Sequence, residues 1–173
     1  MTDEIRKYSR ARGSYESIAV VNMTRARRAL RGVVLVSRFG LAAMWLLAAG
    51  AKIYTAADFR ANVASIVGAR WAWGATLVVI GLELLAALLL ILPRTVRAGA
   101  LASAALLVGF AAFALFYVYV MKGEPLECGC FGRLIASQLG VKTALRNLAL
   151  LVPALAVLAW HGRGRSRPGG QEV

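Results

Sequence analysis

Few side chains in this 173-residue chain can cross-link the fold or bind a transition metal. The chain has two cysteines, Cys128 and Cys130, and one histidine, His161. Small secreted folds held together by disulfides carry more cysteines, and a tetrahedral zinc site normally takes four ligands. We therefore expect neither a disulfide framework nor a metal site within one chain.

Acidic side chains are also scarce. The chain has 8 Asp and Glu residues against 21 Lys and Arg residues, and 60% of its residues are hydrophobic. In a soluble protein the resulting net charge of +13 would favour a nucleic-acid partner. Here the basic residues cluster at the ends of apolar runs, which is typical of membrane proteins that contact anionic lipid headgroups. We expect an integral membrane protein in a lipid bilayer, with no nucleic-acid partner.

Long apolar runs are abundant, and four of them cover approximately residues 33–54, 74–92, 98–121 and 143–160. About 20 helical residues cross the hydrocarbon core of a bilayer. Because lipid offers no hydrogen bonds, backbone groups there must be satisfied within the helix. The sequence therefore predicts an all-α fold, an integral membrane four-helix bundle that occupies residues 33–161.

The connections between the runs differ in length, and small residues recur within the runs. Residues 55–73 are predicted to form a loop whose tryptophans suit the headgroup region, and residues 93–97 a tight turn. The pairs Gly99–Ser103 and Ala105–Gly109 follow the small-xxx-small pattern, which lets helix backbones approach closely. We expect these positions to lie in helix contacts.

Both ends of the chain are basic and polar. We expect residues 1–32 to be a cytoplasmic, partly disordered segment, and residues 162–173 to be a disordered basic tail. Within the first segment, residues 15–31 fit either a short helix on the membrane surface or a solvated tail. These two segments flank the predicted transmembrane domain.

The distribution of positive charge predicts the topology. Thirteen Lys and Arg residues belong to the two terminal segments and the 93–97 turn, against five in the loops 55–73 and 122–142. The positive-inside rule then places both termini in the cytoplasm and the second loop, with the cysteines, outside the inner membrane. Disulfides persist on that side.

The cysteines themselves form a Cys-Gly-Cys sequence between the last two runs. A disulfide between Cys128 and Cys130 is a tight fit, and strained disulfides are easier to reduce. Gly129 between them widens the allowed backbone dihedrals. Such a labile pair suits thiol–disulfide exchange better than cross-linking. The alternative is that the two cysteines are unrelated free thiols.

The second run contains an acidic residue at its midpoint, Glu83. A charge there costs at least about 2.5 kcal/mol on insertion scales, so this residue must be paired, protonated or next to a polar cavity. Arg38 in the first run either extends toward the inner surface or reaches Glu83. A structural ion pair of Glu83 with Arg38 or Lys52 is the alternative to a functional role.

Two cations share the predicted outer layer with the cysteine loop. Lys52 lies near the outer end of the first run, and Arg146, followed by Asn147, lies near the outer end of the fourth. Because a nearby cation lowers the pKa of a thiol, Lys52 or Arg146 would stabilise a thiolate at Cys128 or Cys130. The alternative is that both cations contact lipid phosphates.

Taken together, these motifs are similar to those of one known family. They are Gly50-Ala51-Lys52 at the end of the first run, Glu83 in the second, Cys128-Gly129-Cys130-Phe131-Gly132 before the fourth, and Arg146-Asn147 near its start. With this set, the segment from about 33 to 160 resembles the methylamine-utilisation protein MauE family, within the wider DoxX-like group of four-helix membrane proteins. The Cys-Gly-Cys-Phe-Gly element is the specific part of the resemblance.

The resemblance implies a membrane protein of thiol–disulfide handling with a thioredoxin-like companion. In the family this is linked to maturation of the disulfide-rich small subunit of methylamine dehydrogenase. We expect Cys128 and Cys130 to exchange a disulfide with such a partner, as a possible thiol–disulfide oxidoreductase without a cofactor in the chain. Since no second cysteine pair relays electrons, either a quinone reacts directly with the pair or another protein completes the circuit.

Two other functions stay open. One is a membrane scaffold that docks a soluble partner, in which the cysteines form a static clip. The other is a small transporter, which depends only on Glu83 and the cations and would need oligomerisation. The sequence sets neither the oligomeric state nor the direction of electron flow.

Overall fold

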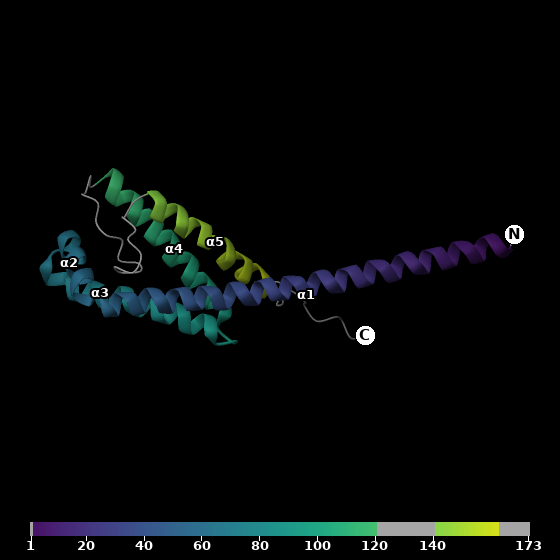
Figure 1. The fold of residues 1–173 in the computed structure, drawn as a ribbon, viewed down its shortest axis with the longest axis horizontal. Helices are drawn as coiled ribbons and strands as arrows, with labels where there is room; N and C mark the ends of the chain where they lie inside the picture. Colours follow the sequence, from purple (N-terminus) through teal and green to yellow (C-terminus); the bar gives the residue numbers. More distant parts are fainter. Residues whose placement is uncertain (1, 121–140, 163–173) are drawn as a thin grey trace, which may run out of the picture. The chain divides into compact units, whose positions relative to one another are not determined.

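A computed structural model describes the backbone of residues 2–120 and 141–162, and the side chains of these residues from 23 onward. This part of the chain is helical and contains no strand; its helices are α1 (Thr2–Tyr54), α2 (Ala56–Val67), α3 (Ala69–Ile91), α4 (Val96–Tyr119) and α5 (Val141–Gly162) (Figure 1). Within the same residues, four helices are long and apolar enough to cross a membrane: α3, α4, α5 and the segment Met23–Tyr54 of α1. The predicted all-α membrane bundle is confirmed, and the orientation of the termini stays a prediction.

Helix α1 extends much further toward the N-terminus than the first apolar run. It begins at Thr2, where the sequence predicted a partly disordered segment over residues 1–32. The chain divides into two compact units, Met1–Val36 and Ser37–Val173, and the helix bundle belongs to the second. The domain boundaries at residues 32 and 161 stay predictions.

The segment 55–73, predicted as a loop, is helical over most of its length. It contains α2 and the first turn of α3. No glycine or proline interrupts α2 before Gly68, whose φ of 85° is readily adopted by glycine and ends the helix. The prediction of a loop was wrong because this alanine-rich stretch is too polar for a membrane span but suits a short helix. Trp71 and Trp73 lie exposed in the first turns of α3, in keeping with a place near the headgroups.

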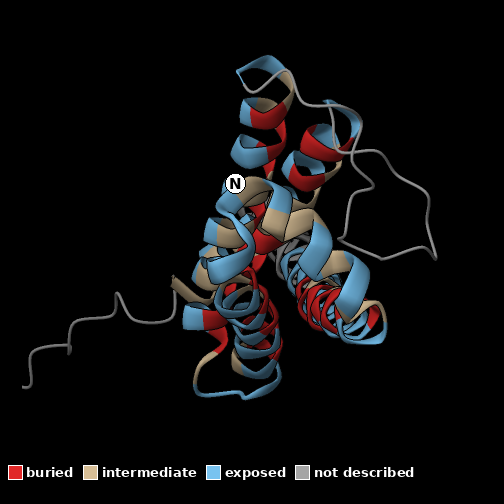
Figure 2. Cartoon of the chain, turned by 90° about the vertical axis from the view of Figure 1, so that its left-hand side faces the viewer, coloured by how far each residue is buried: buried red, intermediate tan, exposed pale blue. Residues whose placement is uncertain are grey.

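The bundle buries small and polar side chains and exposes large apolar ones. Figure 2 shows buried residues gathered on the helix faces that are turned toward one another, with exposed residues on the outer faces. The contact between α4 and α5 centres on Ala111, Ala114 and Ala144. By contrast, Leu77 and Val152 are among the large apolar residues that are more than half exposed. Small residues permit close backbone contact, and lipid covers the apolar outer faces of a membrane bundle.

Helices α3 and α4 lie very close together next to their connecting turn. A Cβ atom at Gly99 would lie 2.6 Å from the backbone nitrogen of Leu90, so only glycine fits there. One turn later Ser103 is fully buried, which confirms the first small-xxx-small pair as a helix contact. The second pair does not pack: Ala105 and Gly109 are both exposed. The small-xxx-small pattern alone does not distinguish a helix face that packs against another helix from a face that carries small residues without such a contact.

Candidate functional site

A buried ion pair joins α1 to α3. Lys52 lies in the last turn of α1 and Glu83 lies in the middle of α3, and their side chains are 2% and 1% exposed. Lys52 Nζ is 2.7 Å from Glu83 Oε1. The ammonium group also lies 5.5 Å from the centre of the Phe59 ring on α2, a cation–π distance. Of the two partners predicted for Glu83, the structure therefore has Lys52.

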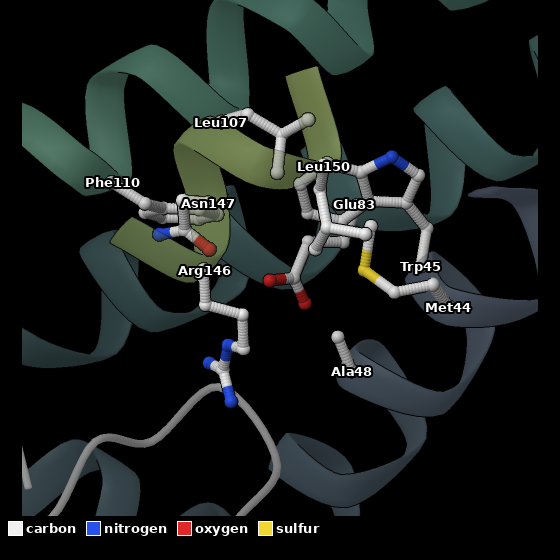
Figure 3. Close-up of a pocket in the computed structure, with 9 residues that line it drawn as sticks. All are labelled: Met44, Trp45, Ala48, Glu83, Leu107, Phe110, Arg146, Asn147 and Leu150. Carbon is white, nitrogen blue, oxygen red and sulfur yellow. The ribbon is translucent and has the colours of Figure 1, made fainter. Parts of the chain in front are cut away.

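A small cavity lies beside this pair and is bounded by four helices. Its volume is about 20 Å³. The polar residues of its lining are Glu83 from α3 and Arg146 and Asn147 from α5. The remainder of the lining is aromatic or aliphatic and consists of Met44, Trp45, Ala48, Leu107, Phe110 and Leu150. Figure 3 shows the Glu83 carboxylate between Asn147 and Arg146 on one side and Met44 and Ala48 on the other.

Some polar atoms of the lining are buried without a hydrogen-bond partner among the described residues. They include the second carboxylate oxygen of Glu83, Oε2, and the amide nitrogen of Asn147, Nδ2. Buried polar groups are nearly always hydrogen-bonded, because an unmade hydrogen bond in a low dielectric costs about 1–3 kcal/mol. These two atoms can therefore form further hydrogen bonds within the site.

Arg38 lies away from this cluster and stabilises the other end of α3. Its Nε donates a hydrogen bond to the carbonyl of Leu90 at 2.6 Å, and a terminal nitrogen donates one to the carbonyl of Ile91 at 2.7 Å. The last carbonyls of a helix have no partner within it and carry partial negative charge, so a guanidinium fits there. Arg38 thus caps α3, and the hypothesis that it reaches Glu83 is not met.

Sequence reasoning missed a second polar contact beside the cavity. Trp45 Nε1 donates a hydrogen bond to Ser103 Oγ at 2.9 Å, which joins α1 to α4. The Trp45 ring also lies 6.2 Å from that of Phe110, centre to centre. The available signal was the position of Trp45 in the middle of an apolar run, since exposed tryptophans favour the membrane surface. A central tryptophan indicates a buried partner for its indole N–H.

The structure thus unites Lys52, Glu83, Arg146 and Asn147 in one cluster and places Arg38 elsewhere. The residues Cys128, Gly129, Cys130, Phe131 and Gly132 lie outside the described part of the chain. Their proximity to the cluster stays a prediction. Within the described residues, no three His, Cys, Asp or Glu side chains gather as metal ligands.

The cluster lies near one end of the bundle. Lys52 is in the last turn of α1, and Arg146 and Asn147 are in the second turn of α5. Figure 1 shows the end of α1, the end of α4 and the start of α5 toward the same end of the bundle. The segment 121–140, which contains both cysteines, connects α4 to α5 and so attaches at this end.

Comparison with known proteins is consistent with the motifs. A family model described as Methylamine utilisation protein MauE matches residues 30–160. Comparison with curated proteins and with solved structures gave no match. The matched segment covers most of the chain and includes the buried cluster together with the cysteine pair. The chain is thus a multi-pass membrane protein that belongs to the MauE family.

Proposed function

We propose that this protein is a membrane thiol–disulfide redox protein that exchanges a disulfide at Cys128 and Cys130 with a thioredoxin-like partner. The observation that carries the proposal is the cluster that Arg146 forms with the buried pair Lys52 and Glu83, at the end of the bundle where the cysteine segment attaches. Buried ionisable residues inside a membrane protein are costly and usually functional. Membership of the MauE family supports the same reading.

The exchange itself needs no cofactor. A thiolate of one cysteine attacks the disulfide of the partner, forms a mixed disulfide and releases a partner thiolate. The thiolate of the other cysteine then attacks the mixed disulfide, closes the Cys128–Cys130 bond and releases the reduced partner. Two electrons pass from the pair to the partner, and the reverse sequence transfers a disulfide outward. Because the chain has two cysteines only, a second redox protein restores the dithiol after the pair has reduced its partner, whereas in the reverse direction a second protein or a quinone takes up the two electrons and restores the disulfide.

Arg146 is the cation that we assign to the thiolate. Lys52 is 2% exposed and bonded to Glu83, whereas Arg146 is less deeply buried and lies five residues after the start of α5. A cation near a thiol favours the thiolate, which is the reactive form. Lys52 and Glu83 then hold α1 and α3 in register.

We further propose that exchange occurs outside the cytoplasm, at the inner membrane, with both termini inside. The support is the excess of Lys and Arg in the terminal segments and the 93–97 turn. A disulfide-containing secreted protein is the substrate class that fits this location, and in the family a methylamine dehydrogenase subunit is the example. Disulfides persist on that side of the membrane.

Trapping the mixed disulfide tests the exchange. In the Cys130→Ser or the Cys128→Ser variant, the remaining cysteine can attack but not resolve, so one variant should accumulate an adduct on non-reducing gels. The variant that lacks both cysteines is the matched control and should give none. Absence of an adduct from both single variants would count against exchange.

The scaffold alternative predicts a different redox behaviour. A static clip should stay oxidised in glutathione buffers, whereas an exchange site should be reduced by them. Measuring the fraction of alkylated cysteine after equilibration separates the two.

The role of Arg146 has its own readout. In Arg146→Met, the pH at which half of the thiol reacts with an alkylating reagent should rise, because the pKa of the thiol rises when the cation is lost. Arg146→Lys should restore most of the effect. Arg97→Met removes an exposed cation near the start of α4 and should leave the profile unchanged. An unchanged profile in Arg146→Met would remove this residue from the site.

A further inference from the structure

Helix α1 has two faces with a regular spacing of three and four residues, and the bundle covers one of them. Buried residues of the covered face are Leu41, Trp45, Ala48 and Lys52. A second series with the same spacing lies on the opposite side of the helix and is exposed at every position. Its members in the unit Ser37–Val173 are Gly40, Ala43, Leu47, Gly50 and Tyr54. This face of α1 has no cover within the described residues of the chain.

The exposed series follows a heptad repeat. In the unit Met1–Val36 the same alternation of three- and four-residue steps continues through the exposed residues Val36, Val33, Ala29 and Ala26. We call the exposed series of both units, from Ala26 to Tyr54, the α1 seam. Apolar residues that repeat in this way at positions a and d are the pattern of helices that pair along a coiled-coil contact. A helix face that contacts only lipid needs no such repeat.

The part of the seam within the apolar run alternates small and large residues. Leu47 and Tyr54 are 65% and 86% exposed, and the positions before them in the repeat are Ala43 and Gly50. A Cβ atom at Gly40 or Gly50 would meet nothing within 4 Å in this chain, so packing inside the bundle does not require either glycine. Small residues let two membrane helices approach closely, and the large ones fill the holes of a facing helix. The seam is therefore suited to contact with another helix.

The distribution of charge in the unit Met1–Val36 indicates what that helix is. Every described side chain from Met23 to Val33 is exposed. With Ala26 at position a, the residues Arg27, Arg28 and Arg31 fall at positions b, c and f, which lie furthest from the contact in a coiled coil. An acidic partner would bind along such a basic face. A second copy of this positively charged segment is repelled there and can approach only along the uncharged seam.

The sequence before residue 23 keeps the same spacing. Its positions in the repeat are Asn22, Ala19, Tyr15, Arg12, Tyr8 and Ile5. A single polar residue at such a position fixes the register of two identical helices at some cost in stability. Since two copies in one membrane share one orientation, identical residues would face each other across a two-fold axis.

We propose that the α1 seam is the contact between two copies of this chain, which pair in the membrane as a parallel dimer through α1. The covered face of α1 then belongs to its own bundle, and the seam belongs to the partner. The contact involves neither the cysteines nor the buried ion pair.

Disulfide cross-linking in native membranes tests this contact. In a background with Cys128→Ser and Cys130→Ser, Ala43→Cys places a thiol at a d position of the seam. Ala105→Cys is the matched control, because Ala105 is an exposed alanine in α4. Oxidation with copper phenanthroline should convert the Ala43→Cys chain, and not the Ala105→Cys chain, into a covalent dimer on non-reducing gels.

Two outcomes of the cross-linking would overturn the proposal. Equal yields from both variants would indicate random collision. Absence of a dimer from Ala43→Cys, or an adduct with a different protein in its place, would mean that lipid or that protein covers the face. Because this background lacks Cys128 and Cys130, none of these results bears on disulfide exchange.

A bulky residue in the seam provides a second test that leaves the bundle intact. Gly40→Leu and Gly109→Leu both add a side chain where this chain has open space, the first on the seam and the second on α4. Energy transfer between donor- and acceptor-labelled chains in vesicles, measured over a range of protein-to-lipid ratios, reports dimerisation. Gly40→Leu should shift the curve several-fold toward higher protein-to-lipid ratios, and Gly109→Leu should match wild type. Transfer that stays at the wild-type value in Gly40→Leu would contradict the assignment of the seam.

Discussion

Removing one member of the buried ion pair should be among the most damaging single substitutions in the bundle. In Lys52→Met the Glu83 carboxylate keeps its burial and loses the ammonium that lies 2.7 Å away. At an effective dielectric constant of 20, two unit charges at this distance attract by about 6 kcal/mol, which offsets the cost of removing both from water. Breaking a buried pair typically costs about 3–5 kcal/mol of stability, and we expect a loss of this size.

A double-mutant cycle separates the pair from the packing of its members. Replacing both residues, as Lys52→Met with Glu83→Met, leaves no uncompensated charge and should cost clearly less than the sum of the single losses. Unfolding by SDS in mixed micelles, followed by tryptophan fluorescence, measures each free energy. Lys142→Met removes an exposed lysine from α5 and should change stability by less than about 0.5 kcal/mol. Additive losses in the cycle would refute the coupling.

Three further predictions concern other contacts between the helices of the bundle. Gly99→Ala should destabilise by about 1–3 kcal/mol, since its Cβ would lie 2.6 Å from a backbone nitrogen of α3, while Gly109→Ala, with open space around it, should be neutral. Arg38→Met should cost about 2–3 kcal/mol in the same unfolding assay because it removes two hydrogen bonds to the last carbonyls of α3. Trp45→Phe removes the 2.9 Å hydrogen bond to Ser103 and should cost about 1 kcal/mol more in wild type than in a Ser103→Ala background; equal losses would contradict that bond's contribution.

Length and hydropathy were sufficient to predict the four spans. Each apolar run matches a helix to within a few residues at most ends. The thickness of the bilayer fixes the length of a span, and backbone N–H and C=O groups inside lipid must be hydrogen-bonded within the helix. The helical segment 56–67 was missed since it is neither long nor apolar, and hydropathy does not report on such helices. The extent of α1 before residue 33 likewise has no hydropathy signal, because polar, charged residues form helices without one; a helix over residues 15–31 was one of two alternatives there.

The sequence predicted only part of the polar cluster. Glu83 stood out because a carboxylate in an apolar run needs a partner, and the lysine that satisfies it was one of two candidates. Arg38 and Lys52 lie on nearly the same face of α1, about 21 Å apart along its axis. The choice between them therefore required the offset of α1 relative to α3 along the helix axes, which side-chain packing sets and hydropathy does not. The indole contact of Trp45 likewise depends on which face of α4 turns inward.

Disulfide exchange outside the cytoplasm is tested most directly by the accessibility of Cys128 and Cys130 in intact cells. After mild reduction, a membrane-impermeant maleimide should label both cysteines without permeabilisation. A variant free of native cysteines that carries Arg94→Cys, in the turn between α3 and α4, should react only after permeabilisation. Labelling of the native pair only in permeabilised cells would place the thiols on the cytoplasmic side and contradict the proposed function.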